Sequence, residues 1–187
     1  MDTLLDTDLP TLTADEFMRT DQRVFGDAGR YELLDGRPVA MAPPTDKHAI
    51  IAGRLVHALA LALAASGLPC DAAVGPGVRP ANARQTRVLI PDVAVLCGDK
   101  AKRRPVVLVE ILSPSNKGTS YDERRKELMA VEGVEEVVEM EQDSVEACVY
   151  RRREDGWQTA RARGEKAKLE LESLGISVRL GPLYADL

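Results

Sequence analysis

Two apolar segments that each contain one carboxylate, PDVAV (residues 91–95) and VVLVEILSP (residues 106–114), decide the fold of this chain. Both are rich in valine, leucine and isoleucine, which is the composition of strands buried in a sheet. Asp92 and Glu110 interrupt these apolar runs. Burial of an unpaired carboxylate costs several kcal/mol or forces its protonation. Each acid is therefore either paired or part of a functional site.

The alternation of side chains along a strand predicts the face on which each carboxylate lies. Asp92 shares a face with Ala94, and Glu110 shares a face with Leu108. If the two strands are neighbours, both carboxylates point into one cleft, where a divalent cation such as Mg²⁺ can offset their charge. The alternative is a strand-end carboxylate that pairs with an arginine or caps a loop, and the spacing does not distinguish the two.

Length and composition predict one globular domain. The chain has 187 residues, of which 44 % are hydrophobic and 29 % charged, and we expect a single domain over residues 1–187 with a loose arm at 1–12. The formal net charge of −5 argues against a protein that coats nucleic acid through bulk charge. Local basic patches remain at 100–104 (KAKRR) and 151–153 (RRR), for which the alternative is solvated surface charge.

The cysteines and the apolar segments bear on cellular location. Cys70, Cys97 and Cys148 are far apart and form no CxxC pair, so neither a zinc site nor a disulfide framework is expected. Reduced thiols predict a cytoplasmic protein. The acidic N-terminus lacks the basic start of a signal peptide, and the longest apolar run, at 58–65, is too short to span a bilayer.

Turn formers and apolar periodicity predict the order of secondary structure. We expect a helix that starts at the capping box TADE (13–16), a hairpin (30–34 and 37–42), a helix (47–65), strands (70–78, 88–96, 106–112), a helix (121–131), strands (134–140, 145–152, 157–163) and a short helix or strand near the C-terminus. The helix at 47–65 is apolar on more than one side, so we expect it to be well buried. The mixture predicts an α/β or α+β fold with helices on the faces of a sheet.

Basic side chains after Glu110 are candidates to assist attack on a phosphodiester, because a cation near an activated water stabilises developing negative charge. They are Lys117 in a loop and Arg124, Arg125 and Lys126 on the following helix. The alternative is that DERRKE is a solvated helix face.

His48 and Glu32 are the remaining candidates. His48 stands at the start of the long helix as a ligand, a general base or a residue without chemistry. Glu32, in the first strand of the hairpin, is a third carboxylate or a surface residue.

The ordered blocks RYELLDGRPVAMAPPTDKH, IPDVAVL and VLVEILSPSNKGTSYDERRKELMAVEGVEEV resemble a known family. Together they span about residues 31–150 and resemble the Uma-type endonucleases of the PD-(D/E)XK nuclease superfamily. The resemblance implies a restriction endonuclease-like mixed β-sheet core flanked by helices, and a site for Mg²⁺ (or Mn²⁺).

The resemblance also implies roles for particular residues. Asp92 and Glu110 match the metal-binding carboxylates, Glu32 is the candidate third ligand, and His48 assists as a base or touches phosphate. The lysine expected two positions after Glu110 is absent, because Leu112 stands there.

In this family the lysine has moved to the following helix. The spacing from Asp122 favours Lys126, whereas counting back from Gly133 favours Arg125, so both stay candidates. The chain departs from the family where it reads EEVVEME in place of an aromatic pair, which leaves room for an inactive member.

The expected function is a metal-dependent endonuclease that hydrolyses phosphodiester bonds of nucleic acid, with DNA as the expected partner. The alternative is a non-catalytic interaction module of the same fold, with apolar strands near 134–150 as a homodimer interface. GxSxG, HExxH, P-loop and GxGxxG motifs are absent from the sequence, so other common enzyme classes have no motif support.

Overall fold

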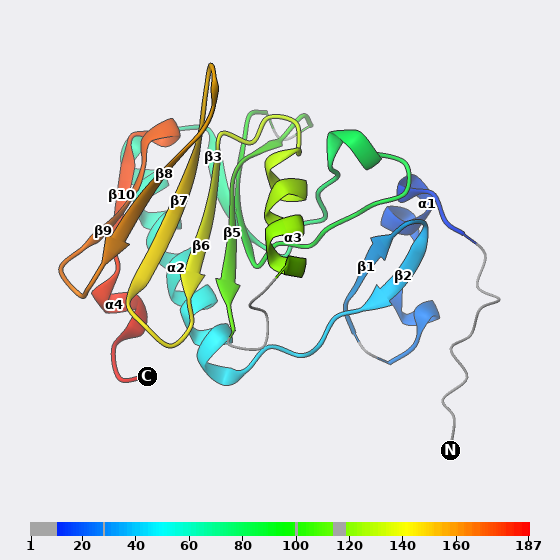
Figure 1. Cartoon of the computed structure of the whole chain (residues 1–187), viewed down its shortest axis with the longest axis horizontal. Helices are drawn as coiled ribbons and strands as arrows, with labels where there is room; N and C mark the ends of the chain where they lie inside the picture. Colours follow the sequence, from blue (N-terminus) through cyan, green and yellow to red (C-terminus); the bar gives the residue numbers. More distant parts are fainter. Residues whose placement is uncertain (1–10, 28, 100, 114–118) are drawn as a thin grey trace.

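A six-stranded mixed sheet forms the centre of the computed structural model, which describes residues 11–27, 29–99, 101–113 and 119–187 (Figure 1). In spatial order its strands are β3 (Cys70–Val74), β4 (Val93–Cys97), β5 (Arg104–Leu112), β6 (Glu136–Glu141), β7 (Glu146–Arg153) and β8 (Gly156–Arg163). Among these six described strands, β5 and β6 alone pair in parallel, and α3 (Thr119–Met129) lies between them in sequence. The predicted arm at 1–12 lies outside the described residues, apart from its last two.

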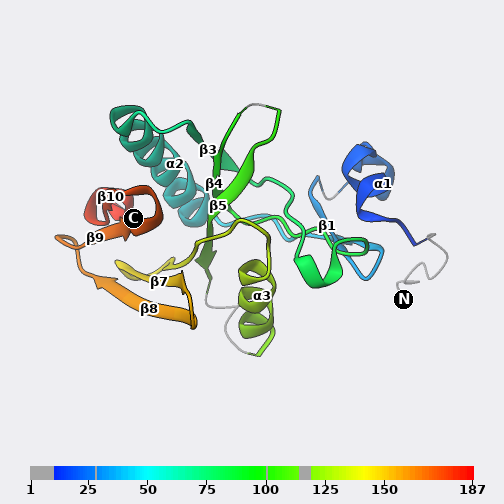
Figure 2. The same ribbon diagram turned by 90° about the horizontal axis from the view of Figure 1, so that it is seen from above.

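Helices cover both faces of this sheet (Figure 2). On one face, α2 (Asp46–Ser66) packs together with the hairpin β9 (Lys168–Leu171) and β10 (Ile176–Arg179) and with α4 (Gly181–Tyr184). α3 covers the other face, where Leu128 packs with Ala94 and Leu108. The mixed sheet flanked by helices confirms the predicted fold class.

A smaller unit of structure stands beside the sheet at the N-terminal end of the chain (Figure 1). It consists of α1 (Ala14–Arg19), a 3-10 turn at Gln22–Phe25, and the hairpin β1 (Tyr31–Leu34) and β2 (Arg37–Ala40). The capping box is present, since Thr13 Oγ1 accepts from Glu16 N at 3.2 Å and Thr13 N donates to Glu16 at 2.7 Å. The predicted Asp-Gly turn is also present, with φ of 51° at Asp35 and 79° at Gly36.

The irregular segment between β3 and β4 differs from the prediction. The predicted strands 70–78 and 88–96 are shorter, because Pro91 has no N–H to donate to a ladder. Val88 and Leu89 instead make isolated bridges with Leu33 and Val78. The bridge between Leu33 and Val88 attaches the N-terminal hairpin to the segment that connects β3 and β4.

α2 is less buried than its composition predicts. Ile51, Leu55, Leu59 and Leu63 form its buried stripe, whereas Leu61 is 60 % exposed. By length and composition this helix could cross a membrane, contrary to the expectation from its longest apolar run, and 22 % of its most apolar window is buried. Its stripe contacts the sheet in the way of a helix that covers a core.

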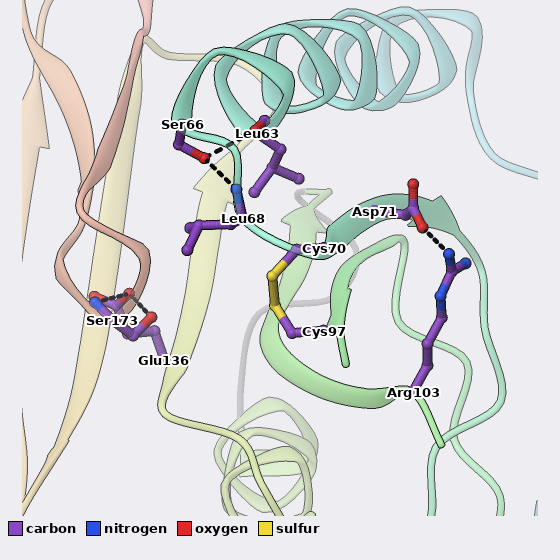
Figure 3. Close-up of a disulfide and its surroundings, with 9 residues drawn as sticks. All are labelled: Leu63, Ser66, Leu68, Cys70, Asp71, Cys97, Arg103, Glu136 and Ser173. Atoms are coloured by element: carbon purple, nitrogen blue, oxygen red, sulfur yellow. Dashed lines mark hydrogen bonds and ion pairs between the residues drawn. A yellow bond between two sulfur atoms is a disulfide. The ribbon is translucent and has the colours of Figure 1, made fainter. Parts of the chain in front are cut away.

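Cys70 and Cys97 form a disulfide, which contradicts the expectation from sequence (Figure 3). The two residues are 27 positions apart and stand opposite each other in the register of β3 and β4. Cys148 is free. The prediction of a cytoplasmic protein therefore loses the support of reduced thiols and stays a prediction.

The apolar strands proposed as a homodimer interface are occupied within the chain. Val137, Val138, Met140 and Val149 are all buried in the two main cores. These side chains are not available to a second copy, so a dimer, which stays a prediction, would use another surface.

Candidate active site

A cavity of about 650 Å³ lies where the first hairpin, the start of α2, the ends of β4 and β5, and α3 meet. Four of the predicted site residues line it: Glu32, His48, Asp92 and Glu110. The structure therefore brings together two carboxylates from neighbouring segments and two further candidates from elements far away in sequence.

Asp92 stands immediately before β4, at the edge of the cavity. Its Oδ2 accepts a hydrogen bond from the backbone N–H of Ile111 at 2.8 Å and contacts His48 Nε2 at 3.1 Å. The bond to Ile111 holds the Asp92 carboxylate against β5, next to Glu110. Thr45 caps α2 by accepting a hydrogen bond from the backbone N–H of His48. This cap fixes the start of the helix and therefore the position of His48 in its first turn.

The contact with Asp92 also shifts the pKa of His48. The hydrogen bond to Asp92 raises the pKa of His48, while burial and the charge of Arg30 oppose the rise. In the imidazolium form, Nε2 donates to Asp92 Oδ2.

Glu110 is buried on the face of the sheet that α3 covers. Burial above all, and then the charges of Asp92 and Glu32, raise its pKa to about 8, although Arg124 opposes the shift. Arg124 Nε donates to Glu110 Oε1 at 2.9 Å. A carboxyl group in this setting binds either a proton or a cation at neutral pH.

Glu32 is fully engaged by Arg124 and the backbone. The Arg124 guanidinium donates to both oxygens of Glu32, at 2.9 and 2.8 Å. Glu32 Oε1 also accepts from Ile90 N at 2.7 Å. Glu32 therefore orients Arg124, and its lone pairs are less available for the metal ligation predicted for it.

Of the basic side chains on α3, Arg124 lines the cavity, whereas Arg125 and Lys126, the candidates from the family resemblance, do not. Burial disfavours the charge of Arg124, but Glu110 and Glu32 outweigh it and raise its pKa above the ordinary value. Arg125 instead donates to Glu139 at 2.9 Å, pairs with Asp122 and stacks on Tyr150. Lys126 is exposed.

The physical reason is the helical repeat. Successive residues of a helix are rotated by about 100°, so neighbours on α3 face different surroundings. Leu128 is fully buried and marks the inner face of α3, and Arg124 lies four residues before it on the same face. This i, i+4 relation was the signal in the sequence that could have identified Arg124.

The other basic candidates lie elsewhere or outside the described residues. Lys117 is outside them. Arg103 pairs with Asp71, and Arg104 begins β5, six residues and so roughly 20 Å along the strand from Glu110. The described part of the basic turn, residues 101–104, is therefore remote from the cavity, and Lys100 lies outside the described residues.

The second basic cluster, at 151–153, serves the packing of β7. Arg151 pairs with Glu136, Arg152 donates to the carbonyl oxygens of Val134 and Met129, and Arg153 pairs with Glu172.

Within the part of the chain that the structure describes, no group of three His, Cys, Asp or Glu side chains could hold a metal ion. Two carboxylates remain, Asp92 and Glu110. Mg²⁺ is commonly bound through only one or two carboxylates, with water and substrate phosphates as the other ligands. The donor set thus fits an ion of this kind that is completed by substrate.

The family model Uma2, described as "Putative restriction endonuclease", matches residues 14–181. The chain belongs to the Uma2 family. This Uma2 protein is also 25 % identical over 194 residues to the uncharacterized protein slr1290 of Synechocystis sp., with 95 % of this chain and 94 % of that protein covered. The family resemblance predicted from the three sequence blocks is confirmed.

A solved structure shares the fold. It is a crystal structure from Anabaena variabilis described as "a putative nuclease belonging to DUF820", with a TM-score of 0.69 at 17 % sequence identity. The match covers 93 % of this Uma2 protein and 98 % of that chain. At this identity the match shows a common fold.

Proposed function

We propose that this Uma2 protein is a metal-dependent nuclease that hydrolyses phosphodiester bonds of nucleic acid, with DNA as the substrate. The observation that carries the proposal is the convergence of Asp92 and Glu110, with Arg124 beside them, in one cavity. The description of the family and that of the structural relative both name a nuclease, which supports the same conclusion.

Asp92 and Glu110 would hold Mg²⁺ or Mn²⁺. When bound, such an ion lowers the pKa of a water molecule and polarises a phosphoryl oxygen. Ion binding requires the ionised form of Glu110, so the ion takes the place of the proton that burial favours there.

The protein's own groups prepare the site for hydrolysis. The Ile111 N–H and His48 hold the Asp92 carboxylate in one orientation. Arg124, fixed by Glu32, places a permanent positive charge next to Glu110. This charge can stabilise the negative charge that develops on the phosphoryl oxygens as water adds to phosphorus and the sugar oxygen leaves with a proton.

The alternative, a non-catalytic module of the same fold, is supported by one observation. Arg124 already compensates Glu32 and Glu110, and burial favours the neutral form of Glu110. A cavity neutralised in this way is stable without a metal ion.

Calorimetric titration with Mn²⁺ at pH 8 separates the two proposals. A nuclease binds Mn²⁺ with measurable heat, and Asp92→Asn abolishes this heat. A module shows neither heat nor a thermal shift.

Cleavage tests the proposed function directly. Supercoiled plasmid and labelled single strands are incubated with Mn²⁺ and wild type, Asp92→Asn or the control Arg161→Gln. Arg161 is on β8, and its side chain is 71 % exposed. We expect Asp92→Asn to lose at least about 10³-fold in rate and Arg161→Gln to match wild type. Equal cleavage by wild type and Asp92→Asn would exclude the proposal.

A further inference from the structure

The cavity contains one arginine that differs from the others in its pairing. Three arginines line it: Arg30, Arg87 and Arg124. Arg87 pairs with Asp35 and Glu127, and Arg124 pairs with Glu32 and Glu110. Arg30 makes no ion pair with any residue in the described part of the chain, and its Nη2 is buried without a hydrogen-bond partner.

Gly75, in the loop after β3, leaves the space that the Arg30 guanidinium occupies. A Cβ atom added to Gly75 would stand only 2.6 Å from Arg30 Nη2, so the guanidinium occupies the space that a side chain there would need. The N–H of Gly75 donates to the carbonyl oxygen of Asp92 at 3.1 Å. The loop that packs against the Arg30 guanidinium is thus bonded to Asp92, which carries the first carboxylate.

Tyr121 is a second donor without an acceptor in the same cavity. It lies on the first turn of α3, three residues before Arg124 and so on the same side of the helix. Its hydroxyl is buried and has no hydrogen-bond partner among the described residues. Burial first, and then the charges of Glu110 and Glu139, raise its pKa, so the hydroxyl keeps its proton and remains a donor.

Buried polar atoms in folded proteins are almost always hydrogen-bonded, so each exception calls for an explanation. Arg30 Nη2 and the Tyr121 hydroxyl are closed to bulk solvent and have no hydrogen-bond partner in the described part of the chain, so a ligand that enters the cavity and reaches them can supply the acceptors. Both are donors and one is cationic, which selects a ligand that is anionic and rich in acceptors. A phosphate group has these properties, and the arginine fork matches its geometry.

We propose that Arg30 and Tyr121 bind the non-bridging oxygens of a substrate phosphate beside Asp92 and Glu110. The inference rests on the proposed function in identifying this phosphate as part of a nucleic acid. Arg30 supplies the charge and Tyr121 the second donor, so the cavity distinguishes a phosphodiester from neutral ligands.

Binding is measured without cleavage, by fluorescence anisotropy of labelled single-stranded and duplex oligonucleotides in EDTA. The variants are Arg30→Gln, Arg30→Lys and Tyr121→Phe, with Arg161→Gln as the control that changes the net charge equally. We expect Arg30→Gln to weaken binding about tenfold or more, Arg30→Lys less, and Tyr121→Phe about threefold. The control should stay within about twofold of wild type. Equal binding by Arg30→Gln and its control would overturn the inference.

Thermal stability separates ligand binding from a structural role. Removing an unpaired buried hydroxyl does not destabilise a protein, so Tyr121→Phe should melt at or above the temperature of wild type. Inorganic phosphate should raise the melting temperature of wild type more than that of Arg30→Gln. If Tyr121→Phe melts lower and binds oligonucleotide normally, the hydroxyl is bonded to an ordered water only, and its assigned role is excluded.

The inference and the proposed function can fail separately. Loss of binding in Arg30→Gln, combined with no cleavage by wild type in Mn²⁺, would retain the phosphate site and exclude the nuclease. Cleavage by wild type that is unchanged in rate and KM in Arg30→Gln would retain the nuclease and exclude the phosphate site.

Discussion

Two of the buried clusters of glutamate and arginine differ in how completely their polar atoms are paired. In the first, the Glu136 cluster (Glu136, Arg151, Glu172 and Ser173), Glu136 is 1 % exposed. It accepts from Arg151 Nε at 2.9 Å, from the backbone of Glu172 and Ser173 at 3.2 Å, and from the Ser173 hydroxyl at 2.6 Å. Figure 3 shows the contact between Glu136 and Ser173.

The second, the Glu110 cluster (Glu32, Asp92, Glu110 and Arg124), is paired less completely. Burial raises the pKa of Glu110 to about 8. Two donors on residues that line the same cavity, Arg30 Nη2 and the Tyr121 hydroxyl, have no acceptor within the part of the chain that the structure describes. The side chains of this cluster are therefore held in place, but the polar groups of the cavity are not all compensated by hydrogen bonds or opposite charges.

Both clusters line cavities, of about 420 and 650 Å³, so the presence of a cavity does not separate them. Pairing does. A buried polar network whose members are all satisfied stabilises one conformation, whereas unsatisfied members are costly unless a ligand completes them. We infer that the Glu136 cluster is structural and the Glu110 cluster is functional, and four predictions test this contrast.

The largest expected effect is on stability, in the Glu136 cluster. Arg151→Met leaves Glu136 buried without its partner and should lower the free energy of unfolding by about 3–5 kcal/mol. Urea denaturation measures the loss. The rate of cleavage per folded molecule should not change, and a variant that is stable but inactive would contradict the assignment.

The next effect is on activity, and it compares adjacent arginines of α3. Arg124→Ala removes the charge beside Glu110 and should lower kcat/KM about 10²-fold. Arg125→Ala breaks the contacts with Glu139 and Tyr150 and should reduce stability, with activity near that of wild type. The reverse result would support Arg125 as the catalytic cation.

A pH dependence of stability should distinguish Glu110 from other carboxylates. Its pKa is about 8 in the folded protein and near 4.5 in the unfolded chain. Between these values the folded state holds a proton that the unfolded state has released, so stability falls as the pH rises. The melting temperature of metal-free wild type relative to Glu110→Gln should decline across this window, and a constant difference would contradict the raised pKa.

The smallest expected effect is at Lys126, the other cation considered from the sequence. Lys126 is exposed, so Lys126→Ala should change the free energy of unfolding by no more than about 0.5 kcal/mol and leave cleavage unchanged. A loss of cleavage similar to that of Arg124→Ala would show that α3 presents Lys126 to the substrate.

Sequence alone determined the features that depend on neighbouring residues. The capping box at Thr13, the Asp-Gly turn at 35–36 and the end of α2 at Gly67 all follow from local backbone chemistry. Asp92 and Glu110 could be singled out because a carboxylate in an apolar strand is visible in the sequence.

Only the tertiary structure decided which side chains meet. The disulfide of Cys70 and Cys97 depends on the register of β3 and β4. The choice of Arg124 over Arg125 depends on how α3 is rotated against the sheet. The position of the Arg30 guanidinium depends on its contact with Gly75, in a loop about 45 residues later in the sequence. Local sequence specifies the backbone of each element, whereas pairing between elements depends on the one way in which their apolar faces pack together.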